Sequence, residues 1–371
     1  MWVLTNTMPA PSFPRLPFLL FVASSLTTTT QSIAPRMANE CVYTAGQNNF
    51  IVRDSQSTRF LLLDDTIVSS CFCWERETGQ GVLPASSTLG IMATSQGHPT
   101  AGVIGVGHGT SPLSTCRMKT CVVDPVHLPK LADRKIMQTL SDLLHNAARL
   151  ESPTPHHRIH SDLIEAKMYM IGGGGGTLGI ALLTAFPKVT LDVAEREPTI
   201  VTLARSHFGF TSSLDGRLSV YNSDGREFLV GTRGYYDVII IDAIPNHRMA
   251  MDAGTPNRFV TYQFLQTAVT SLHRDNGVVL SNCYHDAIGD VLKTFVELFG
   301  DGRVWYMLVQ PPHHYLVLGF HFNMVTTVEE SVQMSKDVLG DHLHFNRPES
   351  GVLDRKGAQV LCDPGQAGCV V

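Results

Sequence analysis

A run of five glycines at residues 172–176 directly follows a short apolar segment, residues 168–171. Apolar residues at helical spacing come next, and Pro187 ends that pattern. The order strand, glycine loop, helix is typical of nucleotide-type sites, because glycine lets the backbone turn tightly and approach a ligand that any Cβ would push away. Since a glycine run alone could also be a flexible linker, the residues after it decide between the two.

Three further predicted strands each end in an acidic residue or an acidic loop. They are residues 189–194 before Glu195, residues 218–221 before Asp224 and Gly225, and residues 236–241 before Asp242. The carboxyl ends of parallel strands share one edge of a sheet, where such folds bind ligands. An acid at the tip of the second strand is placed to accept hydrogen bonds from ribose hydroxyls. We therefore predict one ligand site at this edge.

This order of elements resembles the class I S-adenosylmethionine-dependent methyltransferases, and the Glu-x-Glu-Pro sequence that starts at Glu195 is similar to the spermidine synthase-like superfamily. Between about residues 170 and 210 the chain looks most like the C-terminal domain of the elongation-factor-1-alpha lysine and N-terminal methyltransferase (methyltransferase-like protein 13). The resemblance implies an α/β fold with a Rossmann-like, mostly parallel sheet and an antiparallel last strand. It also implies a small N-terminal antiparallel β domain, which often builds a homodimer in relatives.

The same resemblance implies a cofactor, S-adenosylmethionine or its decarboxylated form. In the family the glycine loop lies under the methionine part of the cofactor, the acid after strand two takes the ribose, and the acid after strand three takes the adenine amino group. The corresponding residues here are Gly172, Gly174, Gly175, Gly176, Glu195, Asp224 and Gly225. Asp242 is the candidate catalytic residue that faces the reacting amine; the alternative is that it caps the following loop or binds cofactor.

One departure from the family concerns the segment after strand four. Aminopropyltransferases carry Asp-Ser-Ser-Asp-Pro there, and the second Asp deprotonates the attacking amine. This chain reads Asp-Ala-Ile-Pro-Asn from Asp242, so Pro245 stands in the place of that base. We therefore expect a methyltransferase that acts on an amine of a protein or a small molecule. An aminopropyltransferase-like enzyme and a non-catalytic descendant of the fold remain alternatives. Residues 245–257 are expected to line the acceptor site, unless they form a solvated loop.

Charge and histidine patterns argue against a nucleic-acid partner and against a metal site. Only 16% of the 371 residues are charged, the net charge is −5, and no run of Lys or Arg exceeds two, so a nucleic-acid partner is not expected. Histidine clusters at residues 156–160, 313–314 and 342–344 lack carboxylates at ligand spacing, and no metal site is predicted.

Composition along the chain predicts five segments. They are a leader or signal peptide at 1–36, a small β domain at 37–75, a low-order insertion at 76–130, the transferase domain at 131–325 and a C-terminal tail at 326–371. The short apolar centre at residues 16–23 follows Arg15, which is typical of a signal peptide and predicts secretion. The alternative is an unstructured leader on a cytoplasmic protein. The apolar run is too short for a membrane span.

Overall fold

The computed structural model describes part of the chain. The described residues are 40–45, 48–55, 58–63, 66–74, 120–151, 160–211, 215–243, 258–273, 276–284, 288–310, 314–323, 327–340, 344–348 and 358–363. The chain divides into two compact units, Met1–Arg36 and Met37–Val371, and every described residue belongs to the second. The predicted leader, most of the predicted insertion and the predicted acceptor loop at 245–257 lie outside the described residues.

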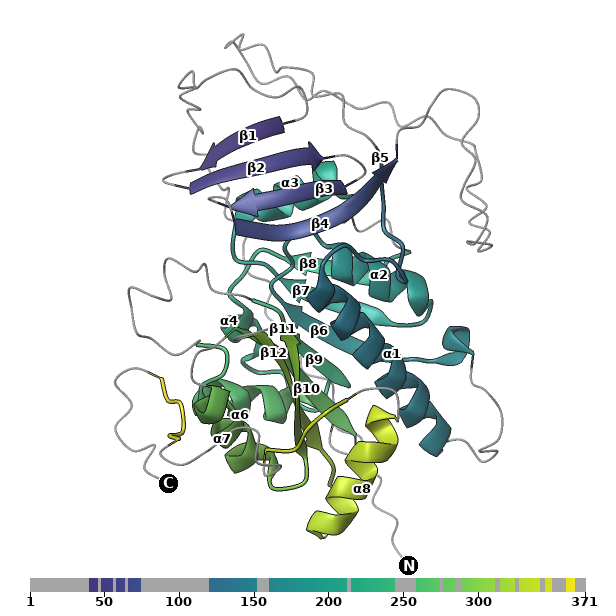
Figure 1. Cartoon of the computed structure of the whole chain (residues 1–371), viewed down its shortest axis with the longest axis vertical. Coiled ribbons are helices and arrows are strands. Elements are labelled where there is room, and N and C mark those ends of the chain that lie inside the picture. The colour runs from purple at the N-terminus through teal and green to yellow at the C-terminus, as the bar shows by residue number, and fades with distance from the viewer. Residues whose placement is uncertain are drawn as a thin grey trace, which may run out of the picture. The chain divides into compact units, whose positions relative to one another are not determined.

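A seven-stranded mixed sheet forms the centre of the second unit (Figure 1). Its strand order is β11-β12-β10-β9-β6-β7-β8. The bounds are β6 Lys167–Ile171, β7 Thr190–Ala194, β8 Leu218–Tyr221, β9 Val238–Ile241, β10 Gly277–Tyr284, β11 Val304–Gln310 and β12 His314–His321. Neighbouring strands from β8 to β10 are parallel, whereas β12 is antiparallel to both β10 and β11. The predicted antiparallel strand on a parallel sheet is confirmed.

Helices cover both faces of this sheet. On one face lie α1 Leu131–Glu151, α2 Thr177–Ala185, α3 Pro198–His207 and α8 Val328–Leu339, and on the other α4 Gly225–Leu229, α6 Tyr262–Ser271 and α7 Ile288–Phe299. A short 3-10 helix, Ser161–Leu163, precedes β6. Alternating side chains of β6 serve the two faces, since Met168 and Met170 pack on the α1 side and Tyr169 and Ile171 pack on the α6 side.

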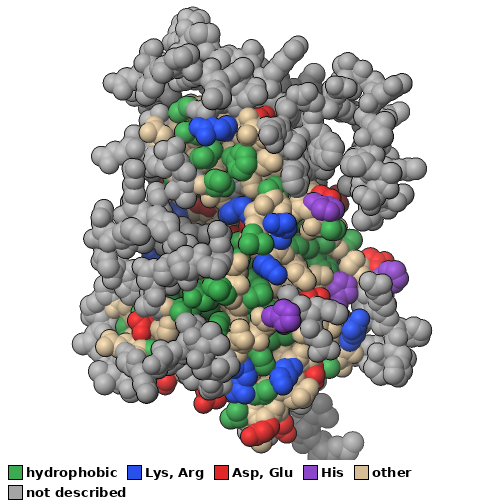
Figure 2. Space-filling view, in the orientation of Figure 1, with side chains coloured by type: hydrophobic (Ala, Val, Ile, Leu, Met, Phe, Trp, Pro, Cys, Tyr) green, Lys and Arg blue, Asp and Glu red, His purple; other side chains and the backbone are tan. Residues whose placement is uncertain are grey.

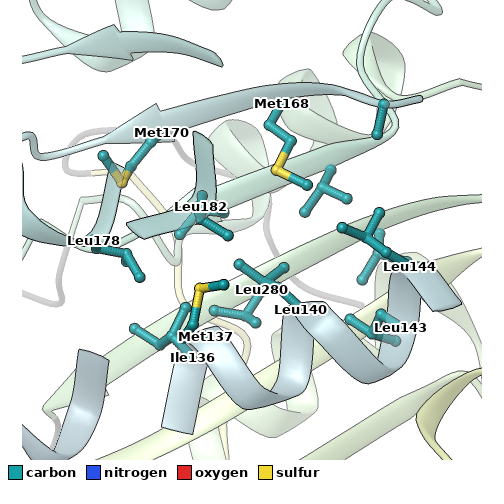
Figure 3. Close-up of a cluster of buried hydrophobic side chains, with 14 of the residues drawn as sticks. Ile136, Met137, Leu140, Leu143, Leu144, Met168, Met170, Leu178, Leu182 and Leu280 are labelled. Carbon is teal, nitrogen blue, oxygen red and sulfur yellow. The ribbon is translucent and has the colours of Figure 1, made fainter. Parts of the chain in front are cut away.

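The apolar stripe of α1 is buried. Ile136, Leu140, Leu143 and Leu144 recur at helical spacing and turn toward β6, α2 and β10, as Figure 3 shows. Because α1 packs along the sheet, its N-terminal end, with Asp133, is held close to the carboxyl edge of the strands.

A separate antiparallel sheet precedes α1, in the order β1-β2-β3-β4-β5. Its strands are β1 Glu40–Ala45, β2 Asn48–Ser55, β3 Thr58–Leu63, β4 Thr66–Trp74 and β5 Thr120–Val122. The small antiparallel β domain is confirmed, but its last strand lies inside the segment 76–130 that the sequence predicted as a low-order insertion. A strand of three residues is too short to show the alternation by which strands are recognised.

The small sheet packs on α3. Phe50, Val52 and Leu61 share a buried cluster with residues of that helix, including Ile200 and Leu203. Arg59 is 2% exposed and binds both carboxylate oxygens of Asp54, at 2.6 and 2.8 Å. Its third nitrogen donates to the carbonyl oxygen of His207 at 2.8 Å and so caps the end of α3.

Replacing Arg59 by methionine is expected to lower the free energy of unfolding by about 3 kcal/mol, because Asp54 is then buried without its cation and the α3 carbonyl loses its donor. Arg205→Met, at an exposed position of the same helix, is the matched control and should change stability by about 0.5 kcal/mol or less. Urea unfolding followed by circular dichroism measures both. Equal losses for the two variants would show that Arg59 does not hold the small sheet on α3.

Described residues of the predicted C-terminal tail also pack on the central unit. The tail contains α8, and residues 358–363 cross α6 and α7. The amide of Tyr262 donates to the Leu361 carbonyl at 2.7 Å, and the amide of Leu361 donates to Thr294 Oγ1 at 2.8 Å. The tail therefore contributes to the fold near the start of α6.

Candidate functional site

The glycine loop joins β6 to α2 at the carboxyl edge of the sheet. Gly172, Gly174 and Gly176 have φ of +88°, +48° and +79°, values that residues with a Cβ rarely adopt. A Cβ on Gly172 would lie 2.9 Å from the backbone of Ala243, the second residue after β9. A Cβ on Gly176 would lie 2.1 Å from the Phe210 ring. The loop is therefore held closely between the end of β9 and Phe210.

Glu195 follows β7 and binds the glycine loop. The amides of Gly173 and Gly174 donate to its Oε2 at 3.0 and 3.1 Å, and the amide of Glu197 donates to its Oε1 at 3.0 Å. Burial raises the pKa of Glu195, and these backbone hydrogen bonds oppose the rise. A carboxylate offers about four acceptor sites, so about one remains for a ligand hydroxyl. Glu195 thus shapes the loop in addition to the ribose role predicted for it.

Asp224 and Gly225 follow β8. Asp224 caps α4 by accepting from the amide of Arg226 at 2.9 Å, and its other oxygen is paired with the guanidinium of Arg258. A Cβ on Gly225 would lie 2.6 Å from Ile171, so only glycine lets α4 approach the tip of β6 this closely. The Arg258 side chain is 42% exposed, and an ion pair of this kind costs little to open. An adenine amino group would compete with Arg258 for Asp224.

Arg226, the next residue, links this side of the site to the C-terminal segment. Its guanidinium donates to the Arg258 carbonyl at 2.9 Å and to both carboxylate oxygens of Asp363, one of them at 2.7 Å. This Arg226 partner holds the pKa of Asp363 below its usual range. Residues 358–363 therefore help to fix the backbone that carries Arg258.

Asp242 follows β9, and its backbone amide donates to the Ile171 carbonyl at 2.9 Å, directly before the glycine loop. Its half-buried side chain accepts a hydrogen bond from Nδ2 of Asn282 at 2.6 Å. Burial raises the pKa of Asp242 to about 6; the charge of Asp133 adds to the rise, while Lys130 and the Asn282 hydrogen bond oppose it. Asp242 is thus a carboxyl group that changes protonation near neutral pH.

Comparison with known proteins gives distant matches. No protein-family model matches the chain. It is 30% identical over 118 residues to the eEF1A lysine and N-terminal methyltransferase of Mus musculus, over 31% of this chain and 17% of that protein. It is 26% identical over 171 residues to the polyamine aminopropyltransferase of Vibrio vulnificus (strain CMCP6), over 45% of this chain and 49% of that protein. These curated relatives are therefore matched over half of their length or less.

Among solved structures, a probable spermidine synthase from Corynebacterium glutamicum ATCC 13032 matches with a TM-score of 0.55, at 16% identity, over 87% of this chain and 96% of that chain. The chain has a spermidine synthase-like fold. It is also a distant homologue of the two groups of transferases over the matched segments. Within the spermidine synthase-like fold, the glycine loop, Glu195, Asp224 and Asp242 all follow neighbouring parallel strands, as predicted from their order.

Four polar residues beside Asp242 were not among the predicted site residues. They are Lys130 and Asp133 at the start of α1, Asn282 near the end of β10 and His314 at the start of β12. Asn282 could have been predicted as a site residue from the sequence, because it is a polar residue at the end of an apolar parallel strand. His314 could not have been predicted in this way, since it belongs to a histidine pair that follows two prolines. Lys130 and Asp133 reach Asp242 only through the packing of α1.

Two negative findings apply to the described part of the chain. None of its helices combines the length and the apolar character needed to cross a bilayer. Within the same residues, no three His, Cys, Asp or Glu side chains gather closely enough to bind a metal ion. Figure 2 shows Lys and Arg side chains interspersed with hydrophobic and other polar ones on the face in view.

Proposed function

We propose that the chain is an S-adenosylmethionine-dependent methyltransferase that acts on an amine, carried by a protein or a small molecule. The observation that carries the proposal is the junction of the glycine loop with Asp242. Gly172 lies against the Asp242–Ala243 peptide, so a ligand over the loop lies beside Asp242, whose pKa burial raises to about 6. Two groups of homologues named as methyltransferase and aminopropyltransferase support a transferase of this kind.

The residues present fit an adenosyl-sulfonium cofactor. The glycine loop is packed closely between the Asp242–Ala243 peptide and Phe210, and its Gly173 and Gly174 amides are held by Glu195, which keeps about one acceptor site for a ribose hydroxyl. Asp224 can accept a hydrogen bond from the adenine amino group once the Arg258 side chain moves away. When bound, the cofactor supplies a carbon already activated by the sulfonium. The protein therefore has to hold and orient the acceptor and to take up its proton.

In this proposal Asp242 is the group that takes up the proton of the acceptor amine. A group that deprotonates an amine has to be ionised at working pH and has to bind the proton well enough to remove it. A carboxyl with a pKa of about 6 meets both conditions at pH 7 to 8. Pro245 stands where aminopropyltransferases carry their second acid, which favours methyl transfer over aminopropyl transfer.

An aminopropyltransferase is the second candidate. The fold match to the probable spermidine synthase covers 96% of that chain and so extends over the small N-terminal sheet, which favours this alternative. Cofactor preference separates the two candidates. Isothermal titration of the full-length chain with S-adenosylmethionine, its decarboxylated form and methylthioadenosine is the test, and we expect S-adenosylmethionine to bind more tightly than the decarboxylated form.

Glu195→Ala is expected to weaken binding of S-adenosylmethionine by about 10- to 100-fold, because the loop amides and a ribose hydroxyl lose a charged acceptor. Glu197→Ala is the matched control, since the Glu197 side chain caps α3 by accepting from the Thr199 amide at 3.2 Å, whereas the Glu195 side chain accepts from the loop amides. Unchanged affinity in Glu195→Ala would remove Glu195 from the site. If none of the three ligands binds to the wild type, both proposed enzymatic functions are wrong.

A further inference from the structure

We propose that Asn282 and His314 are positioning residues for Asp242: they form a directed hydrogen-bond chain that fixes one carboxylate oxygen of Asp242 and leaves the other to receive the proton of the acceptor amine. The chain runs from His314 through Asn282 to Asp242 across three neighbouring strands. This inference rests on the proposed function, because it assigns a role within that same site.

The strand register brings these side chains together. Ile241 of β9 pairs with Ser281 of β10 in parallel, so Asp242 and Asn282 are neighbours at the carboxyl edge. On the other side of β10, Tyr284 pairs with His314 in antiparallel register. Paired residues point to the same face, and residues two apart on one strand do too, so the side chains of His314 and Asn282 share a face. The arrangement therefore follows from the sheet itself.

The chemistry of the groups sets the direction of each hydrogen bond. Asn282 is 2% exposed, its Nδ2 donates to Oδ1 of Asp242 at 2.6 Å, and its Oδ1 lies 2.5 Å from Nε2 of His314. An amide oxygen only accepts, so His314 must carry its proton on Nε2 and donate it. If Asn282 flipped, it would turn an oxygen toward the carboxylate and an N–H toward a donor. His314 therefore holds Asn282 in the orientation that donates to Asp242.

Burial and the neighbouring charges keep His314 neutral, as this hydrogen-bond chain requires. Burial, followed by the charge of Lys130, lowers the pKa of His314 to about 4, so the imidazole is neutral above about pH 5. Lys130 at the start of α1 donates from Nζ to the Val68 carbonyl at 3.2 Å and lies 3.9 Å from Asp133, which is 3% exposed. Among the described residues, Lys130 and Asp133 at the start of α1 act on Asp242 through their charges, Asn282 of β10 donates to it, and His314 of β12 reaches it through Asn282.

The test compares two ligands that differ by one charge, and needs no known acceptor. The full-length chain is titrated with S-adenosylmethionine, a sulfonium cation, and with S-adenosylhomocysteine, its neutral thioether, between pH 5 and 9. Ionised Asp242 beside the glycine loop attracts the cation alone. We expect the wild type to gain at least about threefold in preference for S-adenosylmethionine as the pH rises, with a midpoint near the pKa of Asp242, which is about 6.

Asn282→Leu keeps the branched shape of the side chain but removes the donor, and is expected to move this midpoint upward by about half a unit or more. His314→Phe should move it in the same direction, because Asn282 loses the partner that orients it. His314→Gln keeps an N–H donor and should restore the wild-type midpoint. The restored midpoint in His314→Gln would show that His314 acts by orienting Asn282 and not merely by supporting the fold. If Asn282→Leu does not fold, the two His314 variants alone test the positioning role.

The possible outcomes separately test the positioning role, the placement of Asp242 and the proposed function. An unchanged midpoint in both Asn282→Leu and His314→Phe overturns the positioning role. A pH dependence that persists in Asp242→Asn overturns the placement of Asp242 beside the sulfonium. If neither ligand binds the wild type at any pH, the proposed function fails, and the positioning role fails with it because there is then no transfer for Asp242 to assist.

Discussion

Gly176→Ala is expected to lose binding of S-adenosylmethionine and to destabilise the folded chain by about 2–4 kcal/mol. A φ of +79° costs an alanine about 1 kcal/mol, and its Cβ would lie 2.1 Å from the Phe210 ring. Phe210 is 1% exposed and also lies against Gly179, where a Cβ would be 3.0 Å from the ring, so it has little room to retreat. Overpacking in such a core costs typically about 1–3 kcal/mol more.

Gly231→Ala is the matched control for this prediction. Gly231 also has a positive φ, +92°, but a Cβ there has nothing within 4 Å. The control therefore measures backbone strain alone, and the difference between the two variants measures the contact with Phe210. Urea unfolding and isothermal titration with S-adenosylmethionine check both variants. If Gly176→Ala resembles Gly231→Ala in stability and binds the ligand normally, the loop is not held against Phe210 in the way that the structure indicates.

The sequence predicted the central sheet and the loop because both depend on local patterns. Buried parallel strands appear as short apolar runs, and a glycine run between such a strand and a helix has few other interpretations. The antiparallel last strand was expected from the family resemblance. Acids directly after β7, β8 and β9 placed Glu195, Asp224 and Asp242 at one edge, since strand direction alone decides that position.

What could not be predicted depends on contacts between distant residues. β5 forms because β4 offers an open edge, and its three residues carry no periodicity of their own. Residues 358–363 show no periodicity that predicts a helix or a strand, yet Asp363 pairs with Arg226. The binding of the loop amides by Glu195 required the loop geometry, and the packing of α1 brings Lys130 and Asp133 to Asp242. A carboxylate's place at a sheet edge is local information, whereas its hydrogen-bond partners are not.

Asp242→Asn is expected to lower the rate of methyl transfer by about 100- to 10,000-fold, because an amide cannot take up the proton of the acceptor amine. The same change is expected to stabilise the protein above pH 6. Burial raises the pKa of Asp242 to about 6 in the folded chain, above its value of about 4 in an unfolded chain. Folding therefore favours the protonated acid, whose contribution to stability is complete below about pH 4 and is lost as the pH rises through 6.

The neutral asparagine avoids this loss, so the stability difference between Asp242→Asn and the wild type should grow from pH 4 to pH 6 and then level off. Thermal unfolding across this range measures it. Asp215→Asn, which removes an exposed carboxylate in a turn where asparagine tolerates the φ of +53°, is the control and should show no such trend. A functional acid that costs stability when ionised is retained only if its charge is used. An Asp242→Asn protein with wild-type transfer, or with the same pH trend as Asp215→Asn, would therefore assign Asp242 a structural role.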